Sequence, residues 1–412
     1  MSSYLLRVWT LAGVLLLLTG IAPAQEKESA VRSGVAQEPA QEGGFARPIT
    51  SGSSGTRFDL TNGTAQVPVA VVRGTPYEMG WQLGQLMHRE MQEFIPPALA
   101  GIAGELKVSQ DVLVEVWARS AAFADDRVEQ EMAGLADGSG VPLRTLQAMH
   151  AVPLLMPYSC SSIAAWGDAT ADGHLYQTRN LDWSLEVGAH EFPVIVVYVP
   201  TIGIPHVVPS FAGVIGAHTG MNARGIVLAE MGDAPAKEMP YQVHAPHFTA
   251  YFRTLLYDAD SLTRTLDIFL AQPMTKRYHF VFGDGRNEHR AVKIRAHSSE
   301  APDRRVIVWK DNDPTDEFAP NVMPGVVYND EGRGACPLLK KDYGKLNGEK
   351  LIEVANRIPI KGGNVVDTVY DATDLRLWVS YAKGNQEAYQ RPYVFLDLKA
   401  LDANHDGKPD FK

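Results

Sequence analysis

The segment around Cys160 holds the residues whose types and spacing could do chemistry. Two runs of alternating residues follow one another there, and between them stands Asp172-Gly173, a pair typical of a tight hairpin turn. If the loop runs from Asp168 to Gly173, Cys160 lies directly opposite Leu181 on the second strand. The pattern therefore predicts a β-hairpin that carries a cysteine near one end.

Arg179 and Asp182 lie on the second strand of this hairpin, near the predicted position of the thiol. A nearby cation favours the thiolate, which is the nucleophilic form of cysteine. No histidine is needed as base if Cys160 is a chain terminus, because a free α-amino group has a pKa of about 7.7 to 8.0. Asp182 would orient that amine. A plain surface ion pair is the alternative interpretation of Arg179 and Asp182.

This chemistry requires cleavage of the peptide bond between Ser159 and Cys160. The thiol reaches the Ser159 carbonyl only if that peptide is held in a strained turn, and an N-to-S acyl shift then gives a thioester that water opens. Pro157 predicts such a turn. The sequence thus predicts a nucleophile that is released by the chain itself.

Cys160 and Cys336 are the only cysteines of the chain, so no disulfide framework holds it together. A single Cys160–Cys336 disulfide in a secreted, non-catalytic binding or scaffold protein is the alternative to catalysis. The two hypotheses exclude each other, because a thiol in a disulfide cannot act as nucleophile.

The elements that must position these residues fall into two parts. Residues 66–159 predict a strand, Val67 to Val72, and then mainly helices, the first starting at Gly74, running through Met91 and stopped by Pro96-Pro97. Residues 160–400 mostly show the period of two typical of strands. The predicted strands are Ser162 to Trp166, Leu175 to Arg179, Val194 to Val199, Val214 to Ala217, Gly225 to Ala229, Phe280 to Gly283, Ala291 to Arg295, Val306 to Trp309, Val326 to Tyr328, Leu377 to Tyr381 and Val394 to Leu398.

Helical stretches interrupt the strand-rich part from His247 to Phe269 and from about Gly348 to Asn356. Many strands with helices packed on them indicate an α+β protein.

The N-terminus has the layout of a secretory signal. Arg7 precedes the apolar stretch Val8 to Ile21, and Ala22-Pro23-Ala24 provides small residues for cleavage, so residues 1–24 are expected to be removed. An uncleaved membrane anchor is the alternative. Residues 25–65 are rich in small and polar residues and are expected to form a disordered linker. We therefore expect a secreted or periplasmic protein with no membrane span after signal removal.

An acidic tail over residues 401–412 resembles the start of a calcium loop. Its candidate ligands stand at alternating positions, with Gly407 in sixth place, and are Asp402, Asn404, Asp406 and Asp410. Because the chain ends one residue before the twelfth ligand, only weak calcium binding is expected, and an exposed acidic tail is the alternative. No cofactor is required by the predicted chemistry.

The formal net charge of −10 has its acidic and basic residues interspersed. Nucleic-acid binding needs a clustered basic surface, so that class of partner is excluded. A small-molecule amide is the expected partner.

Four motifs together resemble the cysteine N-terminal-nucleophile hydrolases, specifically the family around acyl-coenzyme A:6-aminopenicillanic acid acyltransferase, with bile-salt hydrolases, penicillin V acylases and acid ceramidase as distant relatives. The motifs are Gly74-Thr75-Pro76-Tyr77-Glu78-Met79-Gly80, residues Cys160 to Asp168, Arg179-Asn180-Leu181-Asp182-Trp183 and Gly220-Met221-Asn222-Ala223-Arg224-Gly225-Ile226.

The resemblance implies a four-layer αββα sandwich, in which residues 66–159 become a small subunit that stays associated with the catalytic part. It implies Cys160 as nucleophile, Arg179 and Asp182 beside it, and Asn329 as donor to the oxyanion. The relatives carry a late arginine, for which Arg333 and Arg376 are both candidates. They also carry a polar residue after the Gly-Met-Asn strand, for which Glu230 and Asp233 are both candidates.

The function that follows is an autoproteolytically activated cysteine amidohydrolase or acyltransferase. It would act on a carbon–nitrogen amide bond through a thioester on Cys160. Hydrolysis is favoured over transfer, because a secreted enzyme does not readily meet coenzyme A.

Overall fold

Two β-sheets organise the part of the chain that the computed structural model describes, which is residues 55–155, 158–232, 243–296, 306–319, 321–330, 332–358 and 363–411. Residues 53–412 belong to one compact unit. The predicted signal peptide and most of the predicted linker lie outside the described residues.

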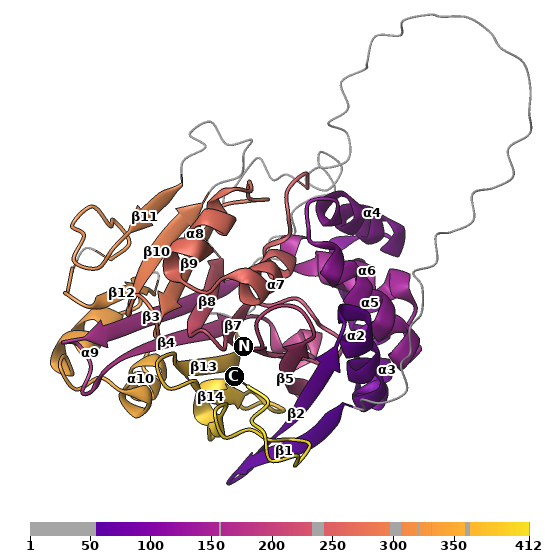
Figure 1. The fold of residues 1–412 in the computed structure, drawn as a ribbon. Coiled ribbons are helices and arrows are strands. Elements are labelled where there is room, and N and C mark those ends of the chain that lie inside the picture. The colour runs from indigo at the N-terminus through magenta and orange to yellow at the C-terminus, as the bar shows by residue number, and fades with distance from the viewer. Residues whose placement is uncertain are drawn as a thin grey trace, which may run out of the picture. The chain divides into compact units, whose positions relative to one another are not determined.

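The smaller sheet carries the predicted hairpin. Its strands are all antiparallel, in the order β12 (Val326–Asn329), β3 (Ser159–Gly167), β4 (Gly173–Asp182), β13 (Asn364–Asp371), β14 (Arg376–Tyr381) and β15 (Val394–Asp397). The strand that begins with Ser159-Cys160 thus has β4 on one side and β12 on the other (Figure 1).

The larger sheet combines strands from both parts of the chain. Its order is β1 (Thr56–Asn62), β2 (Ala65–Gly74), β5 (Pro193–Pro200), β6 (His206–Phe211), β7 (Thr219–Asn222), β8 (Ile226–Gly232), β9 (Tyr278–Asp284), β10 (Arg290–Ala296) and β11 (Ile307–Trp309). Only the β2–β5 pair is parallel among these strands. The segment before Cys160 therefore completes a sheet that the segment after Cys160 builds.

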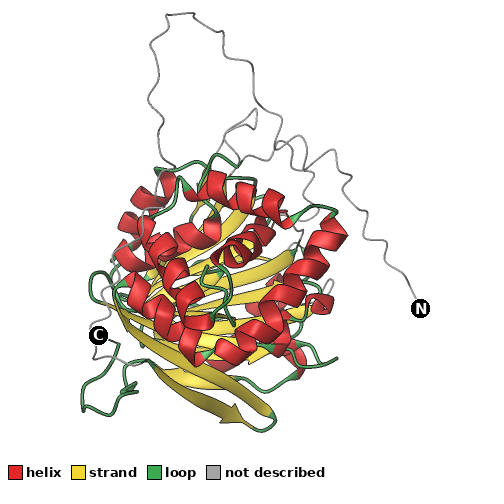
Figure 2. Cartoon of the chain, turned by 90° about the vertical axis from the view of Figure 1, so that its right-hand side faces the viewer, coloured by secondary structure: helices red, strands yellow, loops and turns green. Residues whose placement is uncertain are grey.

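Helices cover the outer faces of both sheets (Figures 1 and 2). On the larger sheet, α2 (Pro76–Leu86) packs on β2, α7 (Phe248–Asp258) on β7 and α8 (Leu262–Leu270) on β9. On the smaller sheet, α10 (Gly348–Ala355) packs on β4 and β13, next to α9 (Ala335–Lys341). Strands β3 and β4 contact β8 and β9, so the two sheets face each other. The predicted four-layer αββα arrangement is confirmed.

The remaining helices of the N-terminal part are α3 (His88–Leu106), α4 (Gln110–Ala121), α5 (Asp126–Ser139) and α6 (Leu143–Leu155). Helices α2 and α5 pack so closely that a Cβ atom at Gly80 would lie 1.9 Å from the carbonyl oxygen of Glu131. Only glycine fits at this position. Thr75 and Glu78 form a capping box at the start of α2. The first of the four motifs thus serves helix packing. Among the described residues, no helix combines the length and the apolarity needed to cross a membrane.

Three predictions about the elements are wrong. The predicted linker, residues 25–65, extends too far, because Thr56–Asn62 alternates half-buried and exposed residues and pairs with β2. Pro96 and Pro97 do not stop a helix but lie inside α3, on its exposed side, where water can bond the carbonyls that they leave free. Residues 214–217 form no strand.

Candidate active site

The hairpin register places Cys160 where the sequence predicts it. Cys160 lies opposite Leu181, and Ser159 lies opposite Asp182. Because side chains alternate along a strand, Cys160 shares its face of the sheet with Leu181 and, two residues before Leu181, with Arg179. This face contacts the larger sheet, so the thiol lies buried between the sheets.

Arg179 binds the thiol directly. Its Nη2 donates to Sγ of Cys160 at 3.2 Å, and its Nε donates to the carbonyl oxygen of Glu230 at 3.3 Å. The remaining nitrogen, Nη1, is buried without a hydrogen-bond partner among the described residues. A buried guanidinium at this distance stabilises the thiolate over the thiol.

Glu230 on β8 approaches the same guanidinium from the opposite sheet. One carboxylate oxygen lies 3.7 Å from Nη2 of Arg179, and the other accepts a hydrogen bond from the hydroxyl of Tyr158 at 2.7 Å. Burial raises the pKa of Glu230 to about 7, although Arg179 opposes the shift. Of the two candidates after the Gly-Met-Asn strand, the structure thus brings Glu230 to the site, while Asp233 lies outside the described residues.

Asp182 lies on the other face of the smaller sheet, beside the peptide that joins Ser159 to Cys160. Its carboxylate accepts from Nη1 of Arg333 and, at 3.2 Å, from the amide of Asn364. Burial raises the pKa of Asp182 to about 6, against the effect of Arg333.

Arg333 is the arginine that the structure brings to the nucleophile. Besides its ion pair with Asp182, it donates through Nη2 to the carbonyl oxygen of Cys160 at 3.0 Å. Arg376 instead pairs with Asp374 at 3.0 Å. The choice between Arg333 and Arg376, open in the sequence, is therefore decided by geometry.

Asn329 ends the strand on the other side of β3. It lies opposite Ser162, which is two residues from Cys160 and points to the same face of the sheet. The side chain is 2% exposed, and its Oδ1 has no hydrogen-bond partner among the described residues. An oxyanion needs the Nδ2–H donor of this amide and not Oδ1, so Asn329 lies on the face of the nucleophile while its donor role stays a prediction.

Asp330, which follows Asn329 directly, also contacts Arg333. The carboxylate of Asp330 accepts from the backbone N–H groups of Gly332 at 3.0 Å and Ala335 at 2.7 Å. Its carbonyl oxygen accepts from Nε of Arg333 at 2.9 Å. Asp330 thereby holds Arg333 close to the end of β12, where Asn329 lies.

The strained turn predicted before Cys160 is not what the described residues show. Ser159 and Cys160 are part of β3 and pair with β4, and neither has a positive φ. Pro157 lies outside the described residues. The peptide is held by strand pairing instead of by a turn.

The disulfide alternative is wrong, because neither Cys160 nor Cys336 is in a disulfide, and both are buried. Cys336 belongs to α9 and packs with Ile163 and Ala165 in the apolar layer on the outer side of the smaller sheet. Cys160 faces the larger sheet, so the sheet separates the two thiols.

Two further polar residues at the site come from β13, a strand that the sequence does not predict. Asn364 bonds Asp182 and, at 2.6 Å, Asp367. Burial, with the charge of Asp182, raises the pKa of Asp367 to about 7. The signal for this strand was the run Val365-Val366, but both of its faces are buried, so the alternation that identifies a half-exposed strand is missing.

An apolar pocket lies beside the nucleophile. Leu181, the cross-strand neighbour of Cys160, is part of its wall, as is Tyr158. Its other walls come from both parts of the chain and include Phe94, Met149, Val152, Trp183 and Phe211. A group bound at Cys160 can therefore extend into apolar surroundings.

The acidic tail is internally bonded. Asp402 accepts from the backbone of Asp406 at 3.1 Å and Gly407 at 2.9 Å, and Asn404 donates to Asp406 at 3.2 Å. Asp410 forms an ion pair with Arg73 at 2.5 Å. Weak calcium binding thus stays a prediction for Asp402, Asn404 and Asp406, whereas the carboxylate of Asp410 is occupied by an arginine.

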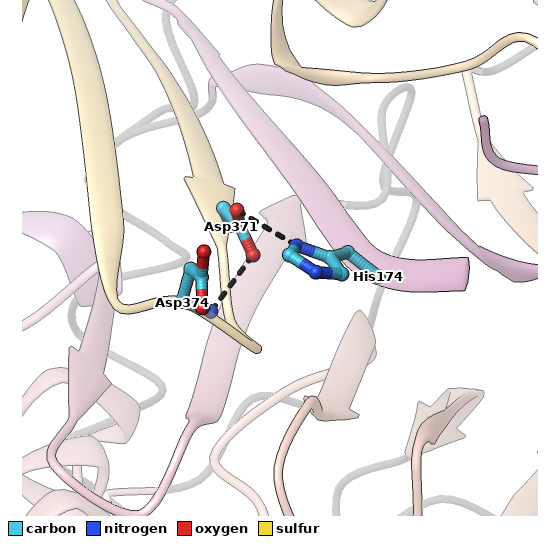
Figure 3. A group of neighbouring side chains, drawn as sticks. All are labelled: His174, Asp371 and Asp374. Atoms are coloured by element: carbon cyan, nitrogen blue, oxygen red, sulfur yellow. Dashed lines mark hydrogen bonds and ion pairs between the residues drawn. The ribbon is translucent and has the colours of Figure 1, made fainter. Parts of the chain in front are cut away.

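His174, Asp371 and Asp374 form the group of potential metal ligands in the described residues (Figure 3). His174 lies 3.1 Å from Asp371, but Asp374 is already paired with Lys399 at 2.9 Å and with Arg376. His174 stands at the start of β4, seven residues before Leu181, which is about 23 Å along the strand. This group is separate from the nucleophile.

No family model matches the chain. It is 27% identical over 381 residues to the protein dcd1B of Dictyostelium discoideum, covering 82% of this chain and 72% of that one. Solved structures with similarity include the Caenorhabditis elegans N-acylethanolamine-hydrolyzing acid amidase ortholog, at a TM-score of 0.39 and 15% identity, covering 57% of this chain and all of that one. Penicillin V acylase from Agrobacterium tumefaciens has a TM-score of 0.40 and 12% identity, covering 60% of this chain and 89% of that one.

Proposed function

We propose that this chain is an N-terminal-nucleophile cysteine amidase that cuts itself before Cys160 and then hydrolyses an amide through a thioester. The observation that carries the proposal is the hydrogen bond from Arg179 to the buried thiol of Cys160, in a strand whose preceding peptide lies against Asp182. A structural cysteine needs no buried guanidinium.

In the self-cleavage step, Sγ of Cys160 attacks the carbonyl carbon of Ser159. This step does not rely on the strained turn expected from the sequence, because strand pairing with β4 holds the peptide. The carbon–nitrogen bond breaks, the nitrogen becomes the free α-amine of Cys160, and water hydrolyses the thioester to release the Ser159 carboxylate. Asp182 is the group placed to receive the new ammonium, because it lies opposite Ser159 in the strand pair.

In turnover, the α-amine takes the thiol proton and the thiolate attacks the amide carbonyl. Asn329 donates to the oxyanion, and Arg179 holds the sulfur. The proton passes to the leaving amine, and water then attacks the thioester to release the acid. Arg333 keeps Asp182 and the Cys160 backbone in place throughout.

Hydrolysis is preferred to acyl transfer because we expect export by the signal of residues 1–24 into the periplasm or the medium, where coenzyme A is scarce. Calcium is not part of the proposed chemistry.

A panel of N-acyl amino acids, N-acyl amines, β-lactams and ceramides, assayed for released amine, tests the proposal. We expect turnover of at least one class by the wild type, none by Cys160→Ala, and most of the activity in Cys336→Ala. Equal losses in both variants, or turnover by Cys160→Ala, would reject Cys160 as the nucleophile.

A further inference from the structure

We infer that the stacked rings of Phe94 and Phe192 form the end wall of the acyl site and limit the length of the acyl group. This inference rests on the proposed function, since it assigns the apolar pocket beside Cys160 to the acyl part of the amide. Leu181 lines this pocket and lies directly across the strand pair from Cys160. An acyl group bound to the sulfur can therefore extend into the pocket.

The apolar pocket is small as the chain stands. Its volume is about 50 Å³. A cavity of roughly 150 Å³ is what holds a benzene molecule. The pocket therefore has room for a short hydrocarbon group and not for a long one.

A second and larger cavity lies close by. This polar groove has a volume of about 570 Å³, which is in the range of roughly 300 to 1,000 Å³ usual for ligand sites. Its walls carry charges of both signs, many of them already paired, as in Arg57–Glu90 at 2.7 Å and Lys383–Glu191 at 2.5 Å. It is therefore a polar space and not an extension of the apolar pocket.

Two aromatic pairs stand between these cavities, and each pair has one member in each cavity wall. Phe94 lines the apolar pocket and stacks on Phe192, which lines the groove, with ring centroids 5.4 Å apart. Phe211 and Tyr381 form the second pair in the same way, at 5.9 Å. The division between the cavities is thus about two rings thick.

The two pairs differ in how firmly they are held. The hydroxyl of Tyr381 donates to the carbonyl oxygens of Val194 at 3.1 Å and Ser210 at 3.0 Å, so that ring is fixed. Phe192 has no such anchor on its ring and is only partly buried. Phe192 is therefore the part of the wall that can be removed with least disturbance, and its removal gives the Phe94 ring, which faces the apolar pocket, room to move back.

Straight-chain carboxylic acids from acetate to dodecanoate probe the wall, because they are the products expected from an amidase and bind without turnover. In the wild-type protein as purified, the affinity for the acid, measured by calorimetry, should rise about fourfold for each added methylene. It should stop rising at a short chain length. In Phe94→Ala, which removes the ring that faces the apolar pocket, the rise should continue for about two further methylenes, into the space that the ring vacates. Phe192→Ala is the second variant and should shift the limit in the same direction by a smaller amount, because it acts only by letting the Phe94 ring move back.

Phe395→Ala is the matched control, since it removes one ring of another aromatic pair, with Trp378 at 5.2 Å, on a partly exposed edge strand. It should leave the length limit unchanged. The same limit in the wild type and in both wall variants, or an equal shift in Phe395→Ala, would overturn the inference. Amidase assays on the same proteins decide the proposed function separately, because acid binding does not depend on turnover.

Discussion

The guanidinium of Arg179 and the thiol of Cys160 meet at 3.2 Å from adjacent strands, with both side chains buried. Arg179 is in turn held by the backbone and the carboxylate of Glu230 on the facing sheet. The environment of the sulfur is therefore set jointly by both sheets.

We expect Arg179→Gln to move the acidic limb of the pH–activity profile to higher pH. Loss of a cation next to the sulfur raises the thiol pKa, by about one to three units for a close opposite charge, so a higher pH is needed to form the thiolate. The measurement is kcat/KM across pH. Arg376→Gln, whose arginine pairs with Asp374 instead, should keep the wild-type limb. A limb that stays in place in Arg179→Gln would show that Arg179 does not act on the thiol.

Asn329→Ala should lower kcat by about 10² with little change in KM, because an oxyanion donor acts mainly on the transition state. Steady-state kinetics on a substrate found in the panel measure both constants. Asn321→Ala, at an exposed asparagine, provides the comparison. An unchanged kcat in Asn329→Ala would remove Asn329 from the reaction.

Thermal stability should fall as the pH rises from about 4.5 to 7. Burial raises the pKa of Glu230 from 4.5 to about 7, so the folded protein binds more protons in this window than the unfolded chain does. Asp367, with a pKa raised to about 7, acts in the same direction. Glu230→Gln should reduce the slope of Tm against pH, whereas the exposed Glu353→Gln should not. An identical slope in Glu230→Gln would contradict the assigned protonation.

The two parts of the chain should stay together after cleavage. Glu131 of α5 and Arg253 of α7 lie on opposite sides of the expected cut and form a buried ion pair at 2.8 Å, with each side chain 1% exposed. Arg253→Met should lower the free energy of unfolding by about 3–5 kcal/mol, because it leaves a buried carboxylate without its partner.

Arg144→Met serves as the comparison, since the Arg144–Asp111 pair is exposed and should contribute less than about 1 kcal/mol. Chemical denaturation measures both variants, and size-exclusion chromatography under native conditions should elute both fragments in one peak. Separate peaks for the wild type would contradict the association.

The hairpin around Cys160 could be predicted because its information is local. Asp172-Gly173 fixes the turn, and counting back from the turn places Cys160 opposite Leu181. Arg333 could not be chosen over Arg376, because its position depends on the turn that Asp330 makes and on the docking of β12 against β3. Asn364 and Asp367 could not be predicted as site residues, because their strand β13 is buried on both faces and shows no alternation of apolar and polar residues.

Intact-mass spectrometry of the purified protein tests the central claim most directly. We predict two fragments, of which the first ends at Ser159 and the second begins at Cys160. The first fragment should start at Gln25 if the signal is removed. A Cys160→Ala protein should remain a single chain, because it lacks the sulfur that attacks the Ser159 carbonyl. A wild-type protein that hydrolyses an amide while Cys160 is still internal would contradict the N-terminal-nucleophile mechanism.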